Sequence, residues 1–213
     1  FFRAAQEIGD LFTRATGHRV VSSFGSSGQL YAQIIQGAPF DVFLSADEGF
    51  PKRLVLEGYG AAHSVFTYAI GRLVLFSADP KRPTSFFILE RSNFDSIAIA
   101  NPALSPYGAA AIQVLKRADL VEHFQTKLIH GSNVTQAYQF VITKNAELGL
   151  VALAQVMAHS HGSRWIVPET LHSPIVQNAI LLKFGADNEG AHEFIRFLQS
   201  PQVSTVKMRY GYE

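Results

Sequence analysis

The 213-residue sequence contains no cysteine, no long apolar run and no cluster of charges of one sign. Without cysteine, disulfide bonds and thiolate chemistry are excluded. No stretch approaches the ~18 consecutive apolar residues of a membrane span, and no charged segment followed by an apolar one opens the chain. Eighteen basic and seventeen acidic residues nearly cancel, which gives no support for an extended nucleic-acid or anionic-membrane surface. Any bound anion must therefore be small.

The most informative stretch that is present runs from residue 20 to residue 47. β-Branched and aromatic residues at 20–24 predict a strand, the Gly-Ser-Ser-Gly sequence at 25–28 breaks it, and the following apolar spacing predicts a helix that begins near Ser27. A buried strand is expected at 41–45. The first N–H groups of a helix have no intrahelical partner and carry the positive end of its dipole. This order of elements therefore favours binding of an oxyanion at the helix start.

The rest of the sequence alternates between helical and extended patterns. Helices are expected at 1–12, 51–57, 107–118, 134–143, 189–199 and 203–210, and extended segments at 66–70, 72–77, 96–100, 148–153, 165–167 and 175–184. Chain crossings near residues 70 and 177 predict an α/β protein of two lobes, each a mostly parallel sheet flanked by helices. Lobe I would comprise 1–70 plus 178–213 and lobe II 71–177. Ligands of such sheets bind where strands end and helices begin, so a cleft between the lobes is expected.

The sequence GSSGQLYAQIIQGAPFDVFLSAD at 25–47 resembles the signature region of periplasmic molybdate-binding proteins, the solute receptors of ABC importers. The similarity continues at 101–108, 131–134, 148–151 and 209–211. It implies a type II periplasmic-binding-protein fold that closes around its solute. This family has a first strand and a hydroxyl-bearing loop ahead of the first helix. We therefore expect that strand, one ligand to the anion and an export signal to lie upstream of Phe1.

Matching the family motifs position by position gives a candidate site at three helix starts. The resemblance implies that Ser27 contributes its serine donor and that Tyr107 and Val134 contribute main-chain N–H groups, since a valine side chain cannot form a hydrogen bond. The remaining candidates are Ser26 as a further donor and flanking positions at Gly25, Gly28, Pro106 and Asn133. Each residue also has a purely structural interpretation. The serines could be ordinary helix caps, Tyr107 could pack its ring, and Val134 could be a core residue.

The three helix starts contain no Asp, Glu, Lys or Arg. Neutral donors can stabilise a fully deprotonated tetrahedral dianion, whereas the proton of hydrogen phosphate would lack an acceptor, at a cost of ~1–3 kcal/mol. Selection among molybdate, tungstate and sulfate would depend on cavity size, so molybdenum is implied by the resemblance alone. Enteric family members carry a tyrosine ligand where this sequence has Ala152. The hydroxyl of Tyr107 is a candidate to replace it.

Other chemistry has less support in the sequence. His159 and His161 have the spacing of a metal pair on a strand but no third ligand nearby, which favours a solvated loop over a metal site. Asp41, Asp47 and Asp79 are more typical of capping or turning residues than of an acidic catalytic cluster. The serines lack the G-x-S-x-G sequence of a hydrolase nucleophile.

We therefore expect a periplasmic receptor that binds molybdate, and also tungstate, and delivers it to an ABC permease. It is predicted to be a monomer without enzymatic activity, cofactor, protein-ligated metal cation or nucleic-acid partner. The alternatives are a receptor for another dianion such as sulfate or thiosulfate, a ligand-sensing domain of a transcription regulator, and an enzyme on the same fold.

Overall fold

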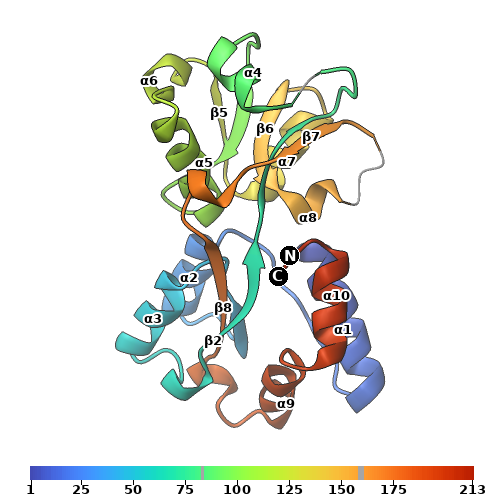
Figure 1. Cartoon of the computed structure of the whole chain (residues 1–213). Coiled ribbons are helices and arrows are strands. Elements are labelled where there is room, and N and C mark those ends of the chain that lie inside the picture. The colour runs from blue at the N-terminus through green and yellow to red at the C-terminus, as the bar shows by residue number, and fades with distance from the viewer. Residues whose placement is uncertain (83, 158–160) are drawn as a thin grey trace. The chain divides into compact units, whose positions relative to one another are not determined.

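The computed structural model describes residues 1–82, 84–157 and 161–213. Its chain forms two compact units, traced by colour along the sequence in Figure 1. Unit 1 consists of Phe1–Ile70 and Val176–Glu213, and unit 2 of Gly71–Ile175. The chain therefore passes between the units twice, once after Ile70 and once after Ile175.

Unit 1 combines a three-stranded sheet with helices from both of its chain segments. Its first segment contains α1 (Phe2–Thr16), α2 (Ser27–Ile35), β1 (Val42–Leu44), α3 (Gly49–Leu56), η1 (Ala62–Ser64) and β2 (Phe66–Gly71). The second contributes β8 (Ile175–Leu181), η3 (Lys183–Gly185), α9 (Glu189–Phe197) and α10 (Pro201–Arg209). The strand order is β1-β8-β2. The returning strand β8 thus lies in the centre of the sheet and joins the two segments.

Apolar packing and polar contacts hold the two segments of unit 1 together. A core cluster joins α2, β1 and α3 to β8 through the buried residues Tyr31, Ile34, Phe43, Leu54, Ile180 and Leu182. Glu7 of α1 accepts hydrogen bonds from Arg209 and, at 3.1 Å, from the Tyr210 hydroxyl. As expected from the helical pattern, α1 ends at Gly17, whose φ of 80° is the left-handed conformation of a helix stop.

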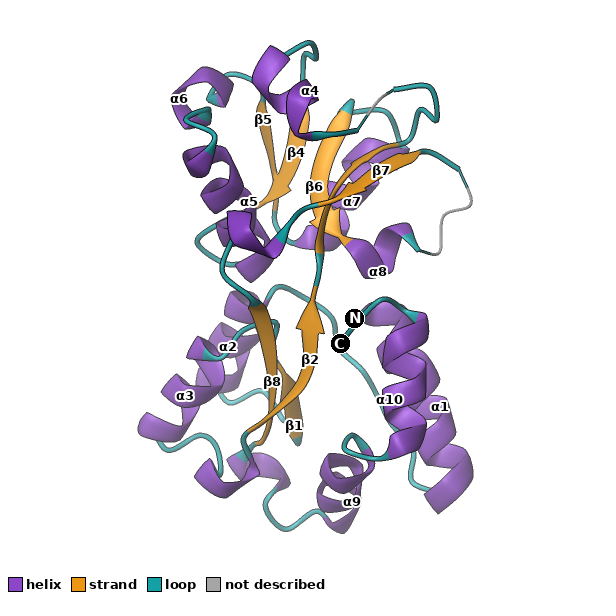
Figure 2. Cartoon of the chain, in the orientation of Figure 1, coloured by secondary structure: helices purple, strands orange, loops and turns teal. Residues whose placement is uncertain are grey.

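Unit 2 is built on a five-stranded sheet with the order β5-β4-β6-β3-β7. In chain order its elements are β3 (Leu73–Ser77), α4 (Phe86–Arg91), β4 (Ile97–Ala100), α5 (Pro106–Arg117), α6 (Val121–Phe124), β5 (Leu128–Gly131), α7 (Val134–Ile142), β6 (Leu148–Ala152), α8 (Leu153–Val156), β7 (Ser163–Ile166) and η2 (Glu169–Leu171). Every residue of β3, β4 and β6 is buried. Successive strand residues point to opposite faces, so both faces of the sheet are covered. Helices α5 and α7 pack against it (Figure 2).

The two-sheet α/β architecture expected from the sequence is confirmed, but the expectation of mostly parallel sheets is wrong. β4 pairs in parallel with β5 and β6, whereas β3 is antiparallel to β6 and β7, and β1 is antiparallel to β8. Parallel pairs need helical crossovers. Helices α5 and α7 supply them for β4, β5 and β6 alone.

The strand expected at residues 20–24 is also absent, although this segment lies entirely within the described residues. Val21 is 81% exposed and Phe24 49% exposed. The Phe24 ring contacts Phe2 with a centroid distance of 4.5 Å. β-Propensity records the fit of a side chain to a pleated, half-buried surface. In this case no neighbouring strand provides such a surface.

Candidate functional site

The start of α2 is closed by a capping box. The Ser26 hydroxyl accepts a hydrogen bond from the Gln29 N–H at 3.3 Å, and the Gln29 side-chain oxygen accepts one from the Ser26 N–H at 3.0 Å. The N–H of Leu30 donates to the Ser26 carbonyl and begins the regular helical pattern. The capping box engages the N–H of Gln29, the third residue of the helix. The N–H groups of Ser27 and Gly28, the first two residues, are therefore left to bind an acceptor from outside the helix.

Ser27 differs from an ordinary cap. Its side chain is buried, and its Oγ accepts a hydrogen bond of 2.9 Å from the N–H of Ala46 in the loop after β1. A serine hydroxyl has one proton, and this contact uses only the oxygen as an acceptor. The proton therefore remains available to a ligand oxygen. The capping interpretation applies to Ser26 but not to Ser27.

In unit 2, α5 and α7 begin at the same edge of the sheet. Strands β4 and β5 are parallel neighbours, with Ala100 opposite Gly131 at their carboxyl ends. The N–H of Asn101 donates to the Gly131 carbonyl at 2.7 Å and extends this pairing into the loops. Helix α5 follows β4 and α7 follows β5. The predicted positions at Tyr107 and Val134 thus lie at one sheet edge, where ligands of such folds bind.

Two glycines allow these helix starts to approach the strand ends. A Cβ at Gly108 would lie 2.2 Å from the Ala100 carbonyl oxygen. One at Gly131 would lie 2.7 Å from the Ala137 nitrogen. All of these neighbours are main-chain atoms that cannot move aside independently. Glycine at both positions is therefore a packing requirement.

The start of α7 resembles that of α2, except that its glutamine accepts from the residue before the cap. The Asn133 side chain accepts from the Gln136 N–H at 3.0 Å, and the Gln136 side-chain oxygen accepts from the Ser132 N–H at 2.6 Å. As in α2, the third amide is engaged, and the amides of Val134 and Thr135 are left for an external acceptor. Val134 is half-buried and packs against the core of unit 2, so it also fulfils its structural interpretation.

The start of α5 has a different construction. Ser105 makes no side-chain cap bond, and Pro106, as the first helical residue, has no N–H. Tyr107 is 4% exposed. The ring is therefore packed in the interior of unit 2, as the structural interpretation expects, and the main-chain N–H of Tyr107 is the first amide of α5.

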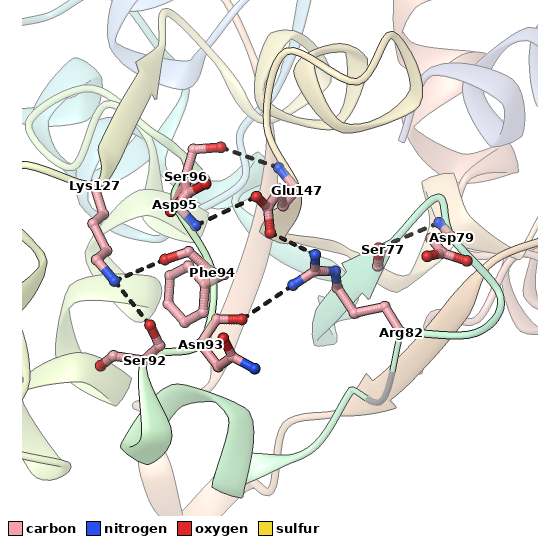
Figure 3. A network of polar contacts seen from close by, with 10 residues as sticks. All are labelled: Ser77, Asp79, Arg82, Ser92, Asn93, Phe94, Asp95, Ser96, Lys127 and Glu147. Atoms are coloured by element: carbon pink, nitrogen blue, oxygen red, sulfur yellow. Dashed lines mark hydrogen bonds and ion pairs between the residues drawn. The ribbon is translucent and has the colours of Figure 1, made fainter.

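One network of charged groups in unit 2 lies at the other end of β4, β5 and β6, as Figure 3 shows. Arg82 forms an ion pair of 2.7 Å with Glu147, and the Lys127 ammonium donates to the carbonyls of Ser92 and Phe94 at 2.8 and 2.7 Å. Glu147 directly precedes β6. A depression of about 270 Å³ beside this network is lined by Asp79, Arg82, Ile88 and Asn93. By contrast, the first turns of α2, α5 and α7 contain no acidic residue.

Asp47 and Asp79 act as capping and turn residues, as the sequence favoured, whereas Asp41 binds a distant side chain. Asp47 accepts from the Phe50 N–H at 2.8 Å, Asp79 from the Lys81 N–H at 2.9 Å, and Asp41 from the Asn188 side chain at 3.0 Å. Burial raises the pKa of Asp47, and hydrogen bonds from main-chain N–H groups oppose that rise.

No metal site emerges from the part of the chain that the structure describes. Within it, no group of three or more His, Cys, Asp or Glu side chains could hold a metal ion. The expected loop at His159–His161 lies largely outside the described residues, since His159 is not among them.

The described helices include none that is both long and apolar enough to cross a membrane.

Sequence reasoning missed Gln29, which closes the capping box of α2, and Gln136, which accepts from the residue before the cap of α7. A signal for both was present. Ser26 and Gln29 have the S-x-x-Q spacing of a capping box, and Asn133 and Gln136 repeat it with asparagine as the cap.

Two α/β units, one of them discontinuous, and the uncharged starts of α2, α5 and α7 are typical of extracellular solute receptors. The chain belongs to the bacterial extracellular solute-binding protein family, whose model matches residues 1–213.

Several of its relatives within that class are named as molybdate-binding proteins. The molybdate-binding protein ModA of Rhodobacter capsulatus is 48% identical over 212 residues, which cover all of this chain and 84% of the relative. The structure of the periplasmic molybdate-binding protein of Azotobacter vinelandii matches with a TM-score of 0.96 at 38% identity, covering 100% of this chain and 95% of that one. The substrate-binding domain of a molybdenum ABC transporter described as putative, from Clostridium difficile, matches with a TM-score of 0.76 at 25% identity, over 99% and 93% of the two chains. The resemblance seen in the sequence is confirmed, and these relatives are named as binding proteins, not enzymes.

Proposed function

We propose that this protein is a periplasmic receptor that binds molybdate, and also tungstate, and delivers it to the permease of an ABC importer. Its similarity to molybdate-binding proteins over the whole chain supports this assignment. The observation that carries it is the set of uncharged helix starts, two of them capped so that their first amides stay available. We further propose that it acts as a monomer, without nucleic acid, cofactor or catalysis.

The proposed donors come from both units. Unit 1 contributes the hydroxyl and amide of Ser27, with Ser26 beside it, and unit 2 contributes the amides of Tyr107 and Val134. Gly25, Gly28, Pro106 and Asn133 shape the turns that present them. We propose that the two units correspond to the lobes expected from the sequence, at 1–70 plus 178–213 and at 71–177.

A titration with four oxyanions tests the function. Molybdate and tungstate are expected to bind, and hydrogen phosphate to bind more weakly by at least ~1–3 kcal/mol, since its proton finds no acceptor among neutral donors. Isothermal calorimetry at neutral pH, with each anion against the same protein sample, measures this order. Tighter binding of sulfate than of molybdate would contradict the molybdate assignment. Binding of none of the four would refute the oxyanion receptor altogether.

Substitution of Tyr107 tests whether its hydroxyl takes the place of the tyrosine ligand that other family members carry where this chain has Ala152. Tyr107→Phe removes only the hydroxyl, so its main-chain amide stays in place. We expect molybdate affinity to fall about tenfold, at the lower end of the ~1.5–3 kcal/mol of a hydrogen bond to a charged group. Competition calorimetry measures the change. Unchanged affinity in both Tyr107→Phe and Tyr107→Ala would leave the residue a packing role only.

A further inference from the structure

The capped starts of α2 and α7 both have a glutamine at the third helical position, where glutamate is the common alternative. The side-chain oxygens of Gln29 and Gln136 accept from the N–H of Ser26 and Ser132 at 3.0 and 2.6 Å. A glutamate could accept the same hydrogen bond, and its charge would also interact favourably with the positive end of the helix dipole. For helix stability alone, glutamate is the better residue.

Other helices of this chain do place acids at their starts. Glu189 is the first residue of α9, and Glu122 lies in the first turn of α6. The first turns of α2 and α7 contain no acid. At these two starts the side chain that folds back toward the cap is instead a neutral amide.

We propose that Gln29 and Gln136 are positioning and specificity-determining residues of the anion site. Each accepts a main-chain N–H at or just before the cap through a neutral amide, while the cap residue engages the third N–H. The N–H groups of the first two helical residues then remain for the anion, with no negative side chain beside them. This inference rests on the proposed function and extends it to two residues that need not touch the ligand.

The physical argument concerns charge at close range. Because each glutamine side chain folds back to the residue at or before the cap, its terminal atoms lie within one helical turn of the first amides. A carboxylate at that point would repel a dianion twice as strongly as a monoanion. The same carboxylate would leave the hydrogen bonds of the box intact.

The test uses Gln29→Glu and Gln136→Glu, with Gln202→Glu as the matched control. Gln202 is exposed in the first turn of α10, whose cap Ser200 accepts from the Val203 N–H at 3.4 Å. All three substitutions add one carboxylate to the first turn of a capped helix. Thermal unfolding without ligand and molybdate calorimetry on the full chain give stability and affinity separately.

We expect all three variants to melt at or above the wild-type temperature. Gln29→Glu and Gln136→Glu should each lose at least tenfold in molybdate affinity, while Gln202→Glu should stay within twofold of the wild type. A purely structural cap predicts no such loss, and so affinities equal to that of the control would overturn the proposal. Melting temperatures below the wild-type value in both site variants would also overturn it, because the proposal requires that a glutamate keeps the hydrogen bonds at the helix start. A wild type that binds no oxyanion refutes the proposed function itself, a result distinct from either of these.

Discussion

Ser27→Ala is expected to weaken molybdate binding by about 1.5–3 kcal/mol, a loss of roughly 10- to 150-fold. The Ser27 oxygen is engaged by the Ala46 N–H at 2.9 Å, which fixes the side chain and leaves its proton for the ligand. Alanine removes both the donor and the anchor of the loop after β1. Competition calorimetry against a molybdate chelator measures the affinity, and urea unfolding without ligand measures the accompanying loss of stability.

Ser200→Ala is the control for this prediction. Ser200 caps α10 in the same unit by accepting the Val203 N–H, and it is not among the proposed donors. Its removal should cost about 1 kcal/mol of stability and leave affinity unchanged. A change of less than twofold in the affinity of Ser27→Ala would exclude Ser27 as a ligand to the anion.

The helix starts could be predicted from the sequence because their determinants are local. The segment Gly25–Gly28 ends the extended pattern, and the apolar spacing that follows predicts a helix. The predicted start near Ser27 agrees with α2 at Ser27–Ile35. The helix expected from residue 134 likewise agrees with α7 at Val134–Ile142. Caps and helical periods depend on neighbours within four residues, which a single sequence contains in full.

Sheet pairing could not be predicted in the same way. Residues 20–24 carry strand-forming side chains but find no pairing partner, whereas the short strand β5, which was not predicted, pairs with β4 from Leu128 to Gly131. Both outcomes depend on which distant segment lies alongside. The antiparallel pairing of β3 with β6 and β7 depends on it too. Strand propensity is weaker than such tertiary context.

The packing role of Gly108 also escaped the sequence. It forms part of a segment that resembles the family, but nothing in its neighbours along the chain reveals that the Ala100 carbonyl lies against it. A contact between a helix start and the end of the preceding strand is set by the tertiary fold. The structure therefore adds a reason for this glycine that is independent of ligand binding.

Gly108→Ala is expected to destabilise the protein by about 3 kcal/mol, the upper part of the range for overpacked sites. Its Cβ would lie 2.2 Å from the Ala100 oxygen and 2.9 Å from the carbonyl carbons of Ala100 and Asn101. These are main-chain atoms of β4 and its loop, so α5 must move away from the sheet. In a helix without this contact, alanine would instead stabilise by roughly 0.5–1 kcal/mol. The sign of the effect thus separates the packing requirement from helix propensity.

Gly49→Ala provides the comparison, since it places the same substitution at the first residue of α3. Its Cβ would meet only the Asp47 side chain, at 3.4 Å, an ordinary van der Waals distance. Urea unfolding should show this variant within about 0.5 kcal/mol of the wild type, the usual range for substitutions that disturb no packing. Molybdate affinity should fall in Gly108→Ala but not in Gly49→Ala, because a displaced α5 carries the Tyr107 amide with it. Equal stabilities of the two variants would show that the β4 end yields to the added methyl, and the close approach would then not explain the glycine.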